Sequence, residues 1–171
     1  GATAVLWLPE WKIGLTVILG MVGLSYRQWK KWPLGKTFLV AGAWTAAGLG
    51  LPLEGTPQDL LNFPLGGALL ILFAAGALLC DFKDDRQDES TGVRTAVVLW
   101  GRRTASLVAA ALAVGGVVAS LAAGRPGLAI AGLALAVLAA FPKVLSRPRL
   151  GPALVDGALA LPALFILAGL R

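Results

Sequence analysis

Six long apolar runs constrain the fold of this chain more than any other feature of its sequence. They cover residues 11–26, 37–53, 63–80, 104–123, 127–145 and 150–170. A helix needs about 20 apolar residues to cross the hydrocarbon core of a bilayer, and a spanning segment has to satisfy its own backbone hydrogen bonds. The sequence therefore predicts an all-α protein, a polytopic transmembrane helical bundle of about six spans.

The composition agrees with this class and excludes several kinds of chemistry. Hydrophobic residues make up 57% of the chain and charged residues 14%, which does not fit a soluble globular domain, a disordered tail or a disulfide scaffold. The chain has no histidine, so imidazole bases and histidine-bearing metal or haem sites are excluded. A single cysteine, Cys80, cannot form an intrachain disulfide. Any metal is therefore expected to be held by oxygen.

The basic residues predict how the chain is oriented. Twelve of the 15 Lys and Arg residues lie in the loops after the first, third and fifth runs, and only Lys12, Arg125 and Arg171 lie elsewhere. The positive-inside rule places these three loops in the cytoplasm and both termini on the opposite side of the membrane. The net charge of +6 thus reflects topology, and we expect no nucleic-acid partner. We predict a single transmembrane domain over residues 1–171.

Small and polar residues inside the runs predict how the helices pack. Small residues recur at four-residue spacing in two runs, at Gly42, Ala46 and Gly50 and at Ala111, Gly115 and Ala119. Such stripes allow close helix packing in lipid. We expect Trp44 to pack in the core. Asp156 lies inside the last run and is either a polar cavity group or, as we favour, a buried protonated side chain bonded to a neighbouring helix.

An acidic loop follows the third run. Five of the nine acidic residues lie between Asp81 and Glu89. If the helix continued through this loop, Asp81, Asp84, Asp85 and Asp88 would share one face. Carboxylates this close repel one another, and a hard divalent cation such as Mg²⁺ relieves the repulsion while it leaves positions for phosphate oxygens.

Basic residues are interleaved with the acids. Lys83, Arg86 and Arg94 could neutralise the remaining charge of a diphosphate. The alternative is a solvated loop with weak internal ion pairs. The sequence pattern alone leaves both interpretations open.

The motif Asp81-x-x-Asp84-x-x-x-Asp88, followed by Gly92-Val93-Arg94-Thr95 and by Trp100-Gly101, resembles the second aspartate-rich motif of the UbiA superfamily of intramembrane prenyltransferases. The similarity extends to the segment from Tyr26 through Lys30 and Lys31 to Lys36, and to Asp156-Gly157 in the last run. It covers essentially the whole chain, which resembles the later, C-terminal helices of the UbiA-type fold.

The resemblance implies a chemistry and a set of roles. In that family a prenyl diphosphate is bound through Mg²⁺ between two aspartate-rich motifs, ionises, and alkylates a lipophilic acceptor. By resemblance, Asp81, Asp84 and Asp88 would be Mg²⁺ ligands. The diphosphate contacts would be Lys30, Lys31, Lys83, Arg86 and Arg94, and the cavity would include Tyr26 and Asp156.

The family's first aspartate-rich motif is absent. Outside the acidic loop the only acids are Glu10, Glu54, Asp59 and Asp156, which form no second cluster. We therefore expect catalysis to need N-terminal helices missing from this sequence or a partner chain, and we name no catalytic residue. The alternative is a non-catalytic structural subunit of a larger membrane complex that binds a lipid, quinone or pigment. An unrelated six-span transporter or channel component is a third interpretation.

Overall fold

The computed structural model describes residues 9–29, 32–51, 58 and 63–167, and every regular element in these ranges is a helix. The long helices are α2 (Glu10–Trp29), α3 (Gly35–Gly50), α4 (Phe63–Cys80), α6 (Ala96–Ala122), α7 (Pro126–Ala139) and α9 (Leu150–Leu167). The short ones are η2 (Asp81–Lys83), α5 (Asp85–Thr91) and α8 (Pro142–Leu145). The predicted all-α class is confirmed.

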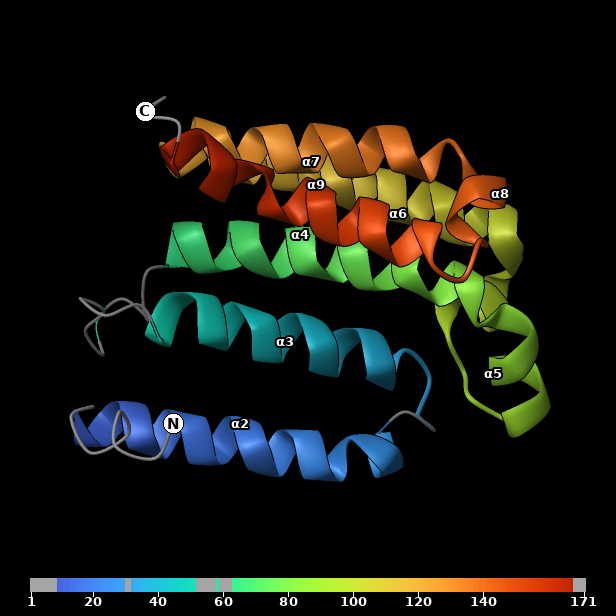
Figure 1. Cartoon of the computed structure of the whole chain (residues 1–171), viewed down its shortest axis with the longest axis horizontal. Helices are drawn as coiled ribbons and strands as arrows, with labels where there is room; N and C mark the ends of the chain where they lie inside the picture. The colour runs from blue at the N-terminus through green and yellow to red at the C-terminus, as the bar shows by residue number, and fades with distance from the viewer. Residues whose placement is uncertain (1–8, 30–31, 52–57, 59–62, 168–171) are drawn as a thin grey trace.

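The long helices lie side by side, and successive ones run in opposite directions (Figure 1). Helix α2 forms one edge and packs on α3, α3 packs on α4, and α4 also contacts α6, α7 and α9. Helix α5 projects from the end of the bundle where α4 finishes and α3 begins (Figure 1). This arrangement brings the acidic loop close to the start of α3.

Small residues allow α4, α6 and α7 to approach one another closely. The buried residues at the centre of α6 include Ala105, Ala109, Ala113, Gly116 and Ser120. A Cβ on Gly116 would lie 2.5 Å from Leu72 Cδ2, and one on Gly132 would lie 3.0 Å from the Ala113 carbonyl oxygen. Glycine at these positions therefore permits the observed helix separation.

The small-residue stripe predicted for α6 does not lie on its buried face. Ala111 is exposed, and Gly115 and Ala119 are only partly buried. Alanine and glycine are so frequent in this helix that four-residue spacing occurs on more than one face. The spacing predicted close packing but identified the wrong face.

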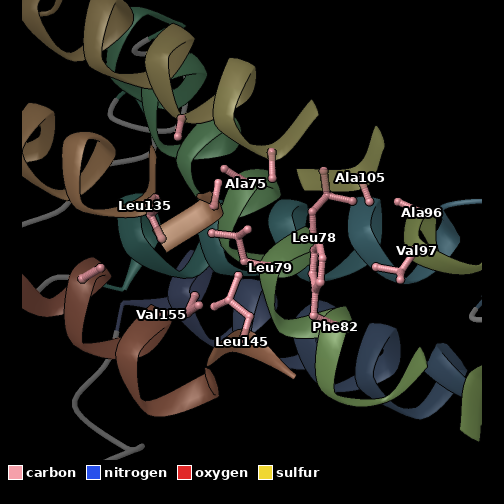
Figure 2. Close-up of a cluster of buried hydrophobic side chains, with 14 of the residues drawn as sticks. Ala75, Leu78, Leu79, Phe82, Ala96, Val97, Ala105, Leu135, Leu145 and Val155 are labelled. Carbon is pink, nitrogen blue, oxygen red and sulfur yellow. The ribbon is translucent and has the colours of Figure 1, made fainter. Parts of the chain in front are cut away.

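A hydrophobic core closes the end of the bundle near the acidic loop. Figure 2 shows Leu79 of α4, Leu145 of α8 and Val155 of α9 directed toward one another, with Phe82 of η2 beside them. Leu79, Phe82 and Leu145 are fully buried. This packing fixes the position of the turn that carries the first aspartates.

Two helical segments are long and apolar enough to cross a membrane within the described residues, Phe63–Lys83 and Ala96–Ala122. The apolar helices Pro126–Ala139 and Leu150–Ala163 are shorter. The fifth predicted run was expected to stay helical to residue 145, but α7 ends at Ala139 and a separate helix starts at Pro142. Proline lacks the N–H that an uninterrupted helix would need there.

The first turn of α6 contains a break at Gly101, where φ is 76° and ψ is 161°. This backbone region is essentially restricted to glycine, so a side chain there costs about 1–3 kcal/mol. We expect Gly101→Ala to lower the free energy of unfolding by about that amount. Chemical denaturation of the detergent-purified protein measures it. Gly115→Ala in the same helix is the control, because its Cβ would make only an ordinary contact at 3.9 Å; equal losses in both variants would contradict the prediction.

Candidate functional site

The acidic loop is a sequence of short helices. Helix α4 ends at Cys80, η2 follows, and Asp84 leaves the helical region with φ −105° and ψ 4° before α5 begins. The Asp85 side chain accepts a hydrogen bond from the Arg86 backbone N–H at 2.8 Å. Aspartate side chains compete in this way with helical hydrogen bonds. The expectation of one uninterrupted helix through this loop was therefore wrong.

Three of the aspartates nevertheless converge, and they converge on a lysine. Lys36 Nζ lies 2.8 Å from Asp81 Oδ1, 3.4 Å from Asp88 Oδ2 and 3.9 Å from Asp84 Oδ2. Burial lowers the pKa of Lys36, but the charge and hydrogen bond of Asp81 and the charge of Asp88 outweigh it and raise that pKa above its ordinary value. Lys36 therefore stays protonated at neutral pH. We call these four residues the lysine–aspartate cluster.

Asp81 is the most deeply buried member of this cluster. Its side chain is 1% exposed, against 12% for Asp88 and 30% for Asp84. Its Oδ2 atom is fully buried and has no hydrogen-bond partner among the described residues. A buried carboxylate oxygen without a partner is costly, so this atom is available to a ligand.

The turn before α3 positions Lys36. Leu34 adopts a left-handed conformation with φ 58°, and its N–H donates to the Arg94 carbonyl oxygen at 3.0 Å. A Cβ on the next residue, Gly35, would lie 2.2 Å from the Trp29 carbonyl oxygen. Only glycine fits there without a backbone shift. The tight turn and its tie to the loop before α6 hold Lys36 against the aspartates.

The other predicted site residues lie around this cluster or elsewhere. Lys83 Nζ lies 3.1 Å from Asp84 Oδ2, and the side chains of Arg86 and Arg94 are exposed. Tyr26 is half-buried and close enough to Lys36 and the three aspartates for their charges to act on its phenol. Lys30 and Lys31 lie outside the described residues.

Asp85 faces away from Lys36. Arg102 at the start of α6 pairs with it, with Arg102 Nη2 and Asp85 Oδ2 2.6 Å apart. Arg102 Nε also donates to the same oxygen at 2.7 Å. This two-point ion pair ties α5 to α6 and leaves Asp85 outside the lysine–aspartate cluster.

A cavity of about 480 Å³ adjoins the cluster. Lys36 and Asp81 line its charged part, and most of the remaining walls are apolar: Val40, Trp44, Phe73, Gly76, Ala77, Cys80, Val155, Leu159 and Ala160. The rings of Trp44 and Phe73 stack with centroids 6.2 Å apart. The cavity is thus amphipathic, with a charged part and an aromatic apolar part.

Two residues on the cavity wall differ from their expected environments. Trp44 is 59% exposed, so it does not pack in the core; it lines the cavity against Phe73 instead. Asp156 is exposed and also lines the cavity, so the expectation of a buried carboxyl bonded to a neighbouring helix was wrong. Both residues lie on helix faces that the cavity separates.

The donor chemistry of the cluster suits Mg²⁺, but its geometry is that of a lysine site. Carboxylate oxygens are the ligands that Mg²⁺ prefers, and Asp81 Oδ2 lacks a partner. Within the described ranges, however, no group of three or more His, Cys, Asp or Glu side chains is arranged so that it could hold a metal ion. The Lys36 ammonium lies among the three carboxylates instead.

Sequence reasoning missed Lys36 as a site residue. It was counted among the basic residues of a cytoplasmic loop, although it lies 52 positions before Asp88 and pairs with it. A lysine at the start of an apolar helix, opposite an acidic loop, was the available signal.

Comparison of the chain with protein-family models, with curated proteins and with solved structures gave no match.

Proposed function

We propose that this chain is the prenyl diphosphate-binding portion of a UbiA-like intramembrane prenyltransferase. The observation that carries the proposal is the amphipathic cavity, where Lys36 and Asp81 lie at one part and Trp44 and Phe73 at another. A prenyl diphosphate has the same division, an anionic head and an apolar chain. Pockets that bind small molecules combine apolar walls with a few polar groups in this way.

We also propose that the chain is a multi-pass membrane protein with about six spans. Only 33% and 28% of the two long apolar segments is buried inside the bundle, whereas the core helix of a soluble protein is mostly buried. Large apolar side chains on α6 and α7 point outward, among them Leu107, Val118, Leu133 and Val137. An exposed apolar surface of this extent suits lipid. The charge distribution of the loops supports a cytoplasmic site, with both termini on the opposite side.

In this proposal the residues of the chain have distinct tasks. Asp81, Asp84 and Asp88 would hold Mg²⁺, which when bound supplies positive charge to the departing diphosphate. Lys36 and Lys83 add positive charge at the head of the ligand, with Arg94 nearby along the chain. Trp44 and Phe73 bind the apolar chain and exclude water from an allylic cation. Asp156 lies on the wall where an acceptor could approach.

A complete active site needs a second acidic cluster, because one cluster cannot bracket a diphosphate. The four acids outside the loop do not group in the sequence. We propose that further N-terminal helices or a partner membrane subunit supply it. Transfer of the prenyl group to a lipophilic acceptor would then occur in the joint cavity.

The lysine–aspartate cluster favours a second candidate function. Because Lys36 already neutralises part of the acidic charge, the cluster is stable without a metal. The chain could therefore serve as a non-catalytic subunit of a membrane complex that holds a lipid, quinone or pigment in the same cavity. Such a ligand would bind equally well with and without Mg²⁺.

Binding of a prenyl diphosphate by the detergent-purified chain separates the two functions. The first predicts binding that requires Mg²⁺ and is lost in EDTA. Trp44→Ala should weaken it about tenfold, because an aromatic wall for the apolar chain is lost. Equilibrium binding of a radiolabelled prenyl diphosphate measures both effects.

Trp100→Ala is the matched control, because Trp100 lies on α6 with 41% exposure, away from the residues that line the cavity. Equal binding in EDTA and Mg²⁺ would contradict the metal role and favour the second function. Equal loss in Trp44→Ala and Trp100→Ala would contradict the placement of the apolar chain.

A further inference from the structure

We infer that Lys36 is the resident cation of the acidic cluster and competes with a divalent cation for it. The Lys36 ammonium lies within 4 Å of one carboxylate oxygen on each of Asp81, Asp84 and Asp88. These residues come from η2, the turn after it and α5, whereas the lysine comes from α3. The ammonium is therefore the shared partner that gathers three separate segments.

The cluster keeps the capacity to bind more positive charge. Three carboxylates face Lys36, and one of them, Asp84, also pairs with Lys83 at 3.1 Å. The two lysines leave one net negative charge uncompensated within this group. The buried Asp81 Oδ2 atom has no hydrogen-bond partner in the described part of the chain, and Asp81 lines the cavity. This atom is a second and independent sign that the cluster accepts a ligand.

A divalent cation and the Lys36 ammonium cannot share these oxygens. A metal bound to Asp81 and Asp88 would lie within a few ångströms of Nζ, at a distance where like charges repel strongly in a partly buried site. Metal binding therefore requires Lys36 to move away from the aspartates. Lys36 also lines the cavity, so the released ammonium remains close to that space.

This exchange gives Lys36 a role in ligand binding that rests on the proposed function. With a metal on the aspartates, the displaced ammonium would be free to bind the anionic head of the ligand. Without a metal, the same ammonium stays paired and the cavity presents less positive charge. Lys36 would thus link occupation of the acidic cluster to affinity for an anion.

Metal binding alone tests the competition without any prenyl diphosphate. Free Mn²⁺ is measured by electron paramagnetic resonance during titration of the full chain in detergent, with Mg²⁺ as competitor. We expect Lys36→Met to bind Mn²⁺ at least about tenfold more tightly than the unmodified chain, because a competing charge is removed. The gain should disappear in the double variant Lys36→Met, Asp81→Asn.

Lys83→Met is the matched control. Lys83 contacts only Asp84 among these aspartates and is 31% exposed, against 19% for Lys36. Its loss should change Mn²⁺ affinity clearly less than the loss of Lys36. Unchanged or weaker Mn²⁺ binding in Lys36→Met, or an equal gain in both variants, would overturn the inference.

Thermal unfolding keeps the test decisive if Lys36→Met folds poorly. Removal of the resident cation should lower the melting temperature, and Mn²⁺ should raise it again more in Lys36→Met than in the unmodified chain. A melting temperature of the variant that does not respond to Mn²⁺ would overturn the inference. Because no prenyl ligand is used, failure of the proposed function leaves this result independent.

Discussion

Replacement of Phe82 by alanine is expected to lower the free energy of unfolding by about 3–5 kcal/mol, the usual cost of truncating a buried aromatic side chain. Phe82 is 0% exposed and packs in the core at the end of α4. Alanine would leave a cavity that the surrounding helices fill only in part. Chemical denaturation of the purified chain in detergent measures the loss.

The consequence should extend to the neighbouring site. Phe82 lies in the single turn η2 with Asp81 and Lys83, so its packing fixes the direction in which Asp81 points. Phe63→Ala is the control, because Phe63 begins α4 and is 82% exposed. We expect the control to lose far less stability. Similar losses in both variants would show that the packing around Phe82 does not stabilise this end of the bundle.

Helices were predictable from the sequence because their signal is local. The third apolar run was expected over residues 63–80, and α4 occupies Phe63–Cys80. Helix boundaries set by proline or glycine were harder. The early end of α7 before Pro142 and the break of α6 at Gly101 each depend on backbone geometry at one residue. Hydropathy averages over such positions.

The packing faces could not be predicted because they depend on partners from distant parts of the chain. Ala111 and Ala113 are alike in the sequence, but Ala111 is exposed and Ala113 is fully buried. Trp44 shows the same limit, since its exposure depends on which helices enclose the cavity. Residue type and spacing predict that helices pack closely, and the tertiary arrangement decides where.

The candidate site was predictable on one side only. The acidic loop has a dense local pattern, and three of its aspartates do converge. Their partner Lys36 is distant in the sequence and has the same composition as any loop lysine. Asp85 was grouped with the others by helical spacing, and the turn at Asp84 places it against Arg102 instead. A turn of this kind changes which acids share a face.

Asp81→Asn is expected to have the largest effect of any single change in the lysine–aspartate cluster. Asparagine keeps the size of the side chain and removes the charge that lies 2.8 Å from the Lys36 ammonium. Breaking a buried ion pair on one side costs about 3 kcal/mol or more, because the other charge stays buried. Asp88 and Asp84 remain at longer distances and offset part of this cost. We expect reduced stability together with loss of Mg²⁺-dependent prenyl diphosphate binding.

Asp85→Asn separates the role of Asp81 from a general effect of acidic charge in the loop. It removes the same charge four residues later, but from the pair with Arg102, whose side chain is 45% exposed. An exposed pair of this kind contributes at most about 1 kcal/mol, so stability and ligand binding should change little. Denaturation and binding measured on both variants decide the matter. If the two variants behave alike, the loop acts through its net charge, and the arrangement of Asp81 around Lys36 has no special part in binding.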